Sequence, residues 1–130
     1  MENIATGQRP AIVIRAADED RLTELAERLV DRQPELADEL LAELSRASVL
    51  SGEAVPRDTV QMGSTFTYES DGTQRRVTLV YPDAADIAAG RVSVGTPIGA
   101  ALLGLAEGQS IDWRARDGRR HMLRIVSVEG

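Results

Sequence analysis

The sequence predicts an α+β fold, in which a short N-terminal antiparallel helical hairpin is followed by an antiparallel sheet with one covering helix. Apolar residues recur with the period of a helix before about residue 50, and with the period of a strand after residue 58. The chain has 130 residues, of which 42% are hydrophobic, so it can form one main core with a small appendage. A linker at Val55 and Pro56 predicts a division into residues 1–55 and 56–130.

The N-terminal part begins with a β-branched run after Pro10, which predicts an extended segment or edge strand at residues 10–15. Asp18 is a candidate N-cap for a first helix. The buried face of that helix is predicted to carry Leu22, Leu25, Ala26 and Leu29. Pro34 suits the first turn of a second helix, whose apolar side is predicted to carry Leu36, Leu40, Leu44 and Ala47. The short turn implies antiparallel helices, and about 13 residues in each give a hairpin about 20 Å long.

The C-terminal part contains two predicted β-hairpins. The first alternates over residues 60–68 and 77–81 around a turn at residues 70–72, and the second covers residues 111–128 with a turn at Asp117 and Gly118. Between them, residues 82–90 predict a loop or short helix, and residues 91–94 predict a short strand. Thr96 as N-cap and Pro97 in the first turn then predict a helix that ends near Gly104 or Gly108.

Composition and charge exclude several kinds of chemistry. The net charge of −6 disfavours binding to DNA or to anionic lipid, and four aromatic residues are too few for a base-stacking surface. The chain has no cysteine and only one histidine, His121, for which a structural role is the better interpretation. No convincing set of nucleophile, base and orienting partner is present, so we expect a binding protein without enzymatic activity or cofactor.

The acidic residues are concentrated in the helical hairpin. Residues 1–55 contain 12 acidic and 6 basic side chains, whereas residues 56–130 contain 9 of each. At the tip of the hairpin, Asp31, Glu35 and Asp38 could bind a divalent cation together with water. The alternative is that they form a solubilising surface, and this interpretation is favoured because acidic helix surfaces are common. We therefore expect no metal site.

Several segments occur in the order known from one family. They are Val60-Gln-Met-Gly-Ser64, Thr78-Leu-Val-Tyr-Pro82, Arg91-Val-Ser-Val-Gly-Thr-Pro-Ile-Gly-Ala-Ala-Leu-Leu-Gly104 and Glu107-Gly-Gln-Ser-Ile111. Over residues 56–130 the sequence resembles the C-terminal domain of the Gre transcript cleavage factors. The whole chain, including Arg9-Pro-Ala-Ile-Val-Ile14, is most similar to the Rnk subgroup, whose name refers to regulation of nucleoside diphosphate kinase and whose coiled coil is truncated.

The resemblance implies an FKBP-like C-terminal fold and docking at the secondary channel of bacterial RNA polymerase, in competition with Gre factors. It places the polymerase contact at Ser93, Gly95, Thr96 and Pro97, which we expect on an exposed edge before the helix. Gly95 is a departure, because some members of the family carry an acidic residue there. The Asp-x-x-Glu pair at the coiled-coil tip of Gre factors is missing, since Pro34 follows Asp31 by three residues. We therefore expect no transcript cleavage activity.

Two further interpretations stay open at this stage. An FKBP-like fold also suggests a peptidyl-prolyl isomerase, although four aromatic residues are few for its apolar pocket. The Rnk resemblance also suggests an indirect effect on nucleoside diphosphate kinase through another protein. In either case we expect a cytoplasmic monomer that does not recognise DNA sequence. We also expect no insertion into membranes, because the chain has no apolar run of the length that a membrane span or signal peptide requires.

Overall fold

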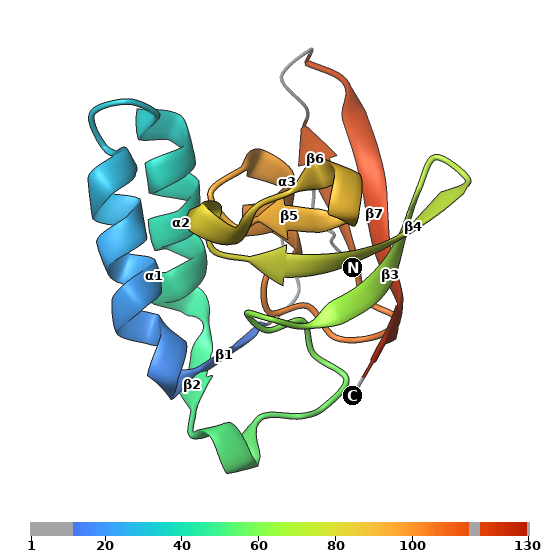
Figure 1. Cartoon of the computed structure of the whole chain (residues 1–130), viewed down its shortest axis with the longest axis horizontal. Helices are drawn as coiled ribbons and strands as arrows, with labels where there is room; N and C mark the ends of the chain where they lie inside the picture. The colour runs from blue at the N-terminus through green and yellow to red at the C-terminus, as the bar shows by residue number, and fades with distance from the viewer. Residues whose placement is uncertain (1–11, 115–117, 130) are drawn as a thin grey trace, which may run out of the picture.

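The computed structural model of the chain describes residues 12–114 and 118–129, and its elements are shown in Figure 1. The helices are α1 (Ala16–Leu29), α2 (Pro34–Arg46) and α3 (Pro97–Leu102). The strands are β1 (Val13–Arg15), β2 (Ser48–Leu50), β3 (Thr65–Ser70), β4 (Thr73–Val80), β5 (Arg91–Ser93), β6 (Ser110–Arg114) and β7 (Arg120–Val128). The short 3₁₀ helices are η1 (Gly52–Ala54), η2 (Pro82–Ala84) and η3 (Ile87–Ala89). The architecture is therefore α+β, with a helical N-terminal part and a sheet.

The two long helices lie side by side and are joined by a turn at residues 30–33 (Figure 1). Pro34 is the first residue of α2, as predicted. The prediction for α1 was wrong at its start, because the helix begins at Ala16 and Asp18 is not its N-cap. Asp18 lies in the first turn instead, where its carboxylate accepts hydrogen bonds from Arg15 and Tyr81. The sequence did not reveal these partners, because Tyr81 is distant along the chain.

The two strands β1 and β2 form a small parallel sheet at the base of the helices, with Val13 opposite Ser48 and Arg15 opposite Leu50. The extended segment before α1 was predicted, whereas β2 was missed because three residues are too few to show a period. β1 also contacts the C-terminal part through its backbone. The Val13 amide donates to the Gly104 carbonyl over 3.2 Å, and the Gln61 side-chain amide donates to the Val13 carbonyl over 2.9 Å.

The second sheet has five strands in the order β5-β4-β3-β7-β6. β3 and β4 form the predicted hairpin, and its two turn residues, Asp71 and Gly72, both have positive φ. β6 and β7 form the other predicted hairpin, and the register of β7 against β3 shifts between Thr67 and Tyr68. Of the predicted turn at Asp117 and Gly118, Asp117 lies outside the described residues.

Two details of the predicted sheet were wrong. β5 runs parallel to β4, because η2 and η3 carry the chain across before it returns to the sheet edge. Residues 60–64 are not part of β3, although they alternate in polarity. Val60 bonds away from the sheet, because its amide donates to the Leu105 carbonyl over 2.8 Å. Only Gly63 and Ser64 still bond to β4, where the Gly63 amide donates to the Leu79 carbonyl over 2.7 Å.

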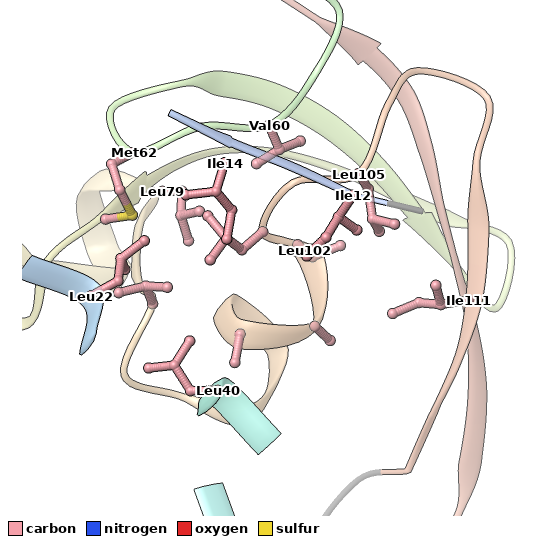
Figure 2. Packing of buried hydrophobic residues seen from close by; sticks show 14 of the residues in the cluster. Ile12, Ile14, Leu22, Leu40, Val60, Met62, Leu79, Leu102, Leu105 and Ile111 are labelled. Carbon is pink, nitrogen blue, oxygen red and sulfur yellow. The ribbon is translucent and has the colours of Figure 1, made fainter. Parts of the chain in front are cut away.

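One cluster of buried apolar side chains links the helices, β1 and the five-stranded sheet (Figure 2). The cluster contains Ile14 of β1 and Ile12, which precedes the strand. It also contains Leu22 of α1, Leu40 of α2 and Leu102 of α3. Full burial of an Ile or Leu side chain contributes roughly 1.5–3 kcal/mol. The hairpin therefore packs on the same core as the sheet. Among the described residues, no helix is long and apolar enough to cross a membrane.

Candidate functional site

The segment from Ser93 to Pro97 is a tight loop between β5 and α3. The Ser93 hydroxyl accepts a hydrogen bond from the Gly95 amide over 2.9 Å. The Thr96 hydroxyl donates to the Ser93 carbonyl over 2.6 Å and accepts from the Gly99 amide over 3.2 Å. Pro97 follows at the first position of α3, so Thr96 caps the helix as predicted. These bonds give the loop one defined shape.

The loop exposes less of its side chains than the sequence suggested. Ser93 is only 7% exposed, so the expectation that it lies on an exposed edge was wrong. Its hydroxyl and its carbonyl are both used inside the turn. Gly95, Thr96 and Pro97 are half-buried, and these three residues form the accessible part of the loop.

Two glycines fit the loop against its surroundings. A Cβ atom on Gly99 would lie 2.0 Å from the Ser93 carbonyl oxygen, so no larger residue fits there without moving the backbone. A Cβ atom on Gly95 would lie 3.2 Å from both Pro82 Cγ and Ser93 Oγ, so a side chain there requires a small displacement of its neighbours. Close packing against the Ser93 carbonyl therefore explains why residue 99 is a glycine.

Sequence analysis missed an exposed apolar residue in η3, the short helix that precedes β5. Ile87 in η3 is 88% exposed, the highest value among the large apolar side chains that the structure describes as exposed. η3 contacts β5, and the Asp86 carboxylate accepts from the Ala89 amide over 3.3 Å, which caps η3. The neighbouring residues give no periodicity, so only the single Ile in an Ala-rich loop could have indicated it.

The side chains of the hairpin tip are more exposed than those of the loop. Asp31, Glu35 and Asp38 are all exposed, and none has an ion-pair partner among the described residues. Within residues 12–114 and 118–129, no group of three or more His, Asp or Glu side chains is arranged to hold a metal ion. The structure thus does not bring the three tip carboxylates together as a metal-binding group.

Arg76 and His121 each have a carboxylate partner on the sheet. The Arg76 guanidinium donates to both carboxylate oxygens of Glu129, over 2.5 and 2.8 Å. This hydrogen bonding lowers the pKa of Glu129. Nδ1 of His121 lies 2.6 Å from a carboxylate oxygen of Asp71, at the β3–β4 turn. Both pairs connect strands of the sheet, which is a structural role.

Comparison with known proteins identifies the class to which this arrangement belongs. The family described as "Transcription elongation factor, GreA/GreB, C-term" matches residues 55–130, and the family described as "Rnk N-terminus" matches residues 10–50. A solved structure, the "Prokaryotic transcription elongation factor GreA/GreB from Nitrosomonas europaea", superposes with a TM-score of 0.75 at 38% identity. That match covers 94% of this chain and 100% of the other. The chain therefore belongs to the GreA/GreB family of transcription elongation factors.

Similarity to individual relatives extends over nearly the whole chain. This chain is 40% identical over 123 residues to the "Regulator of nucleoside diphosphate kinase" of Escherichia coli K12, with 93% of this chain and 90% of that protein covered. It is 39% identical over 140 residues to the "Transcription elongation factor GreA" of Polaromonas naphthalenivorans, with 98% of this chain and 87% of that protein covered. These relatives are named as regulators and elongation factors, and they lend no support to a peptidyl-prolyl isomerase.

Proposed function

We propose that this protein regulates transcription by binding bacterial RNA polymerase at the entrance of the secondary channel, where it competes with Gre factors without stimulating transcript cleavage. The observation that carries this proposal is the combination of a Gre-type C-terminal part with a short helical hairpin. The helices contain 14 and 13 residues, so the hairpin is only about 20 Å long. A truncated coiled coil of this length falls short of the polymerase active site.

The docking surface consists of Ile87 and the Gly95–Pro97 segment in an FKBP-like C-terminal domain. Support comes from the rigidity of the loop, because a loop that is already ordered loses little conformational entropy on binding. The exposed Ile87 side chain would gain free energy when an apolar pocket of the partner covers it. Gly95 leaves this surface without the acidic side chain that some Gre factors have there, so the contact depends on shape and apolar area.

The wider cellular role follows from this binding. The protein is expected to act as a cytoplasmic monomer, and an effect on nucleoside diphosphate kinase is indirect, through transcription.

Among the described residues, no metal-binding group supplies the tip chemistry on which Gre cleavage depends. The division into residues 1–55 and 56–130 is retained as a proposal, with the first part reaching toward the channel and the second part holding the rim.

The experiment that tests the proposal compares two exposed apolar residues. Ile87 is 88% exposed in η3 and belongs to the proposed docking surface, whereas Met122 is 54% exposed on β7 of the sheet. Ile87→Ser is expected to weaken binding to core RNA polymerase by about tenfold, and Met122→Ser is expected to leave it unchanged. Binding is measured by titration with labelled protein, and circular dichroism checks the fold. Equal affinity of wild type and Ile87→Ser would place the docking surface elsewhere, and no binding by the wild type would exclude the function.

A further inference from the structure

A polar network connects the start of the helical hairpin to the C-terminal part. The Tyr81 hydroxyl donates to one carboxylate oxygen of Asp18 over 3.0 Å, and Arg15 Nε donates to the other oxygen over 3.0 Å. Arg15 also donates to the Met62 carbonyl over 2.8 Å. The Arg21 guanidinium carbon lies 3.7 Å from the centre of the Tyr81 ring, which is within cation–π distance. Asp18 and Arg21 belong to α1, whereas Tyr81 and Met62 belong to the C-terminal part.

The environment of this network strengthens it. The Asp18 side chain is only 16% exposed, so its bonds to Tyr81 and Arg15 compete weakly with water. Burial raises the pKa of Tyr81, and the hydrogen bond to Asp18 raises it further. The hydroxyl is therefore protonated, as a donor must be, at every pH near neutrality.

The position of Tyr81 couples the hairpin to the docking surface. Tyr81 follows β4 directly and precedes Pro82, the residue whose Cγ atom packs beside Gly95. Both ends of the hairpin connect to the body through β1 and β2, which lie next to each other. Two adjacent strands fix the base of a hairpin, and its direction depends on the apolar packing of Leu22 and Leu40 in the shared core and on lateral polar contacts. On the α1 side, the network around Tyr81 is such a contact.

We propose that Tyr81 is a positioning residue, which fixes the direction of the helical hairpin relative to the docking surface through Asp18 and Arg21. The consequence for transcription rests on the proposed function: a hairpin with a fixed direction enters the channel as soon as the loop docks. A hairpin that samples several directions would still allow the loop to bind but would block the channel less effectively.

The direct test measures distances between the hairpin and the sheet. The chain contains no cysteine, so Arg32→Cys at the tip and Gln74→Cys on β4, both exposed, can carry spin labels without further changes. Double electron–electron resonance should give one narrow distribution of the distance between the two labels in the otherwise wild-type chain. Tyr81→Phe keeps the ring over which Arg21 lies but removes the hydroxyl, and Asp18→Asn removes the charge. Each is expected to increase the population of other distances by about tenfold, because hydrogen bonds to charged groups are among the stronger ones.

Matched controls separate positioning from general stability. Tyr68→Phe removes a tyrosine hydroxyl from β3, and Asp20→Asn removes an exposed carboxylate two residues after Asp18. Both controls should keep the wild-type distribution. If Tyr81→Phe and Asp18→Asn fold and also keep that distribution, even with a lower melting temperature, the network is merely structural and the proposal is wrong.

A second arm tests the consequence for the polymerase. Tyr81→Phe should bind core RNA polymerase with nearly wild-type affinity but should require about tenfold more protein to inhibit a Gre factor. Unchanged inhibition by a variant with broadened distances would disprove the link between hairpin direction and channel blocking. If the wild type does not bind polymerase at all, the proposed function fails, whereas the distance measurement still decides whether Tyr81 positions the hairpin.

Discussion

The loop between β5 and α3 and the tip of the helical hairpin, the two regions that we propose face a partner, are organised in opposite ways. The loop is held by hydrogen bonds from Ser93 and Thr96 and by the close approach of Gly99 to the Ser93 carbonyl. At the tip, Asp31 and Glu35 are exposed and have no ion-pair partners in the described part of the chain. Folding therefore restricts which residues the loop can contain, whereas residues at the exposed tip can be changed with little effect on folding.

This difference determines how variants in each region should be interpreted. A change at Ser93 alters a buried turn, so weaker binding of such a variant would not identify a contact residue. A change at Asp31 or Asp38 alters charge on an exposed surface, so its effect on binding reports on the partner.

The largest effect is expected for Gly99→Ala. The added Cβ atom would lie 2.0 Å from the Ser93 carbonyl oxygen, so the loop or α3 has to move. We expect a loss of about 3 kcal/mol in the free energy of unfolding, measured by chemical denaturation. Gly52→Ala is the matched control, because the nearest atom to its Cβ, Arg15 Cδ, is 3.8 Å away. Equal stability of the two variants would show that the loop is not tightly packed.

The next largest effect is expected for Thr96→Ala. This change removes both the N-cap of α3 and the donor to the Ser93 carbonyl, so we expect a loss of about 1–2 kcal/mol in the free energy of unfolding. Thr96→Ser keeps the hydroxyl and should recover most of this loss. A Thr96→Ser variant that is as unstable as Thr96→Ala would assign the effect to the methyl group and not to the hydrogen bonds.

At the hairpin tip, reversing the charge of Asp31, Glu35 and Asp38 to Lys should hardly affect folding. These side chains are exposed, so a change of less than about 1 kcal/mol is expected, mainly from Glu35 in the first turn of α2. Association with RNA polymerase should slow by about tenfold at low salt, because the channel admits anionic nucleotides and is expected to be electropositive. Rates are measured by stopped flow at several salt concentrations. An unchanged rate at low salt would mean that the acidic tip only solubilises the protein.

The smallest effect is expected for the ionisation of Tyr81, which connects α1 to the C-terminal part. The folded-state pKa of Tyr81 is raised above its ordinary value of 10.0, so the unfolded chain releases this proton first as the pH rises. The stabilisation from Tyr81 is complete below pH 10 and is lost as the pH increases through the folded pKa. Burial also raises the pKa of Tyr68. Ultraviolet titration of the native protein should therefore show both tyrosines ionising above pH 10, and ionisation of Tyr81 at pH 10 would contradict its buried bond to Asp18.

Sequence analysis predicted the parts of this fold that depend on local signals. The apolar periods of the helices, Pro34, Thr96 and the turn at Asp71 and Gly72 each act over a few residues, and each is confirmed in the structure. Contacts between distant residues were missed. The clearest examples are β2, whose strand exists only because β1 pairs with it, and Asp18, which is bonded to Tyr81.

The candidate site could be predicted only in part for the same reason. The resemblance located the loop, but the burial of Ser93 depends on how α3 packs at Gly99. Ile87 carries no pattern that distinguishes an exposed isoleucine from a buried one. The assignment of polymerase contacts to this loop and the division near residue 55 stay predictions.

Transcript cleavage in backtracked RNA polymerase complexes decides whether the protein competes with Gre factors without stimulating cleavage itself. The protein is added alone, and in rising amounts together with a fixed amount of a Gre factor, in the presence of Mg²⁺. We predict no cleavage by the protein alone and a progressive loss of the cleavage that the Gre factor stimulates. Cleavage by the protein alone, or full Gre activity at saturating amounts of the protein, would contradict the account.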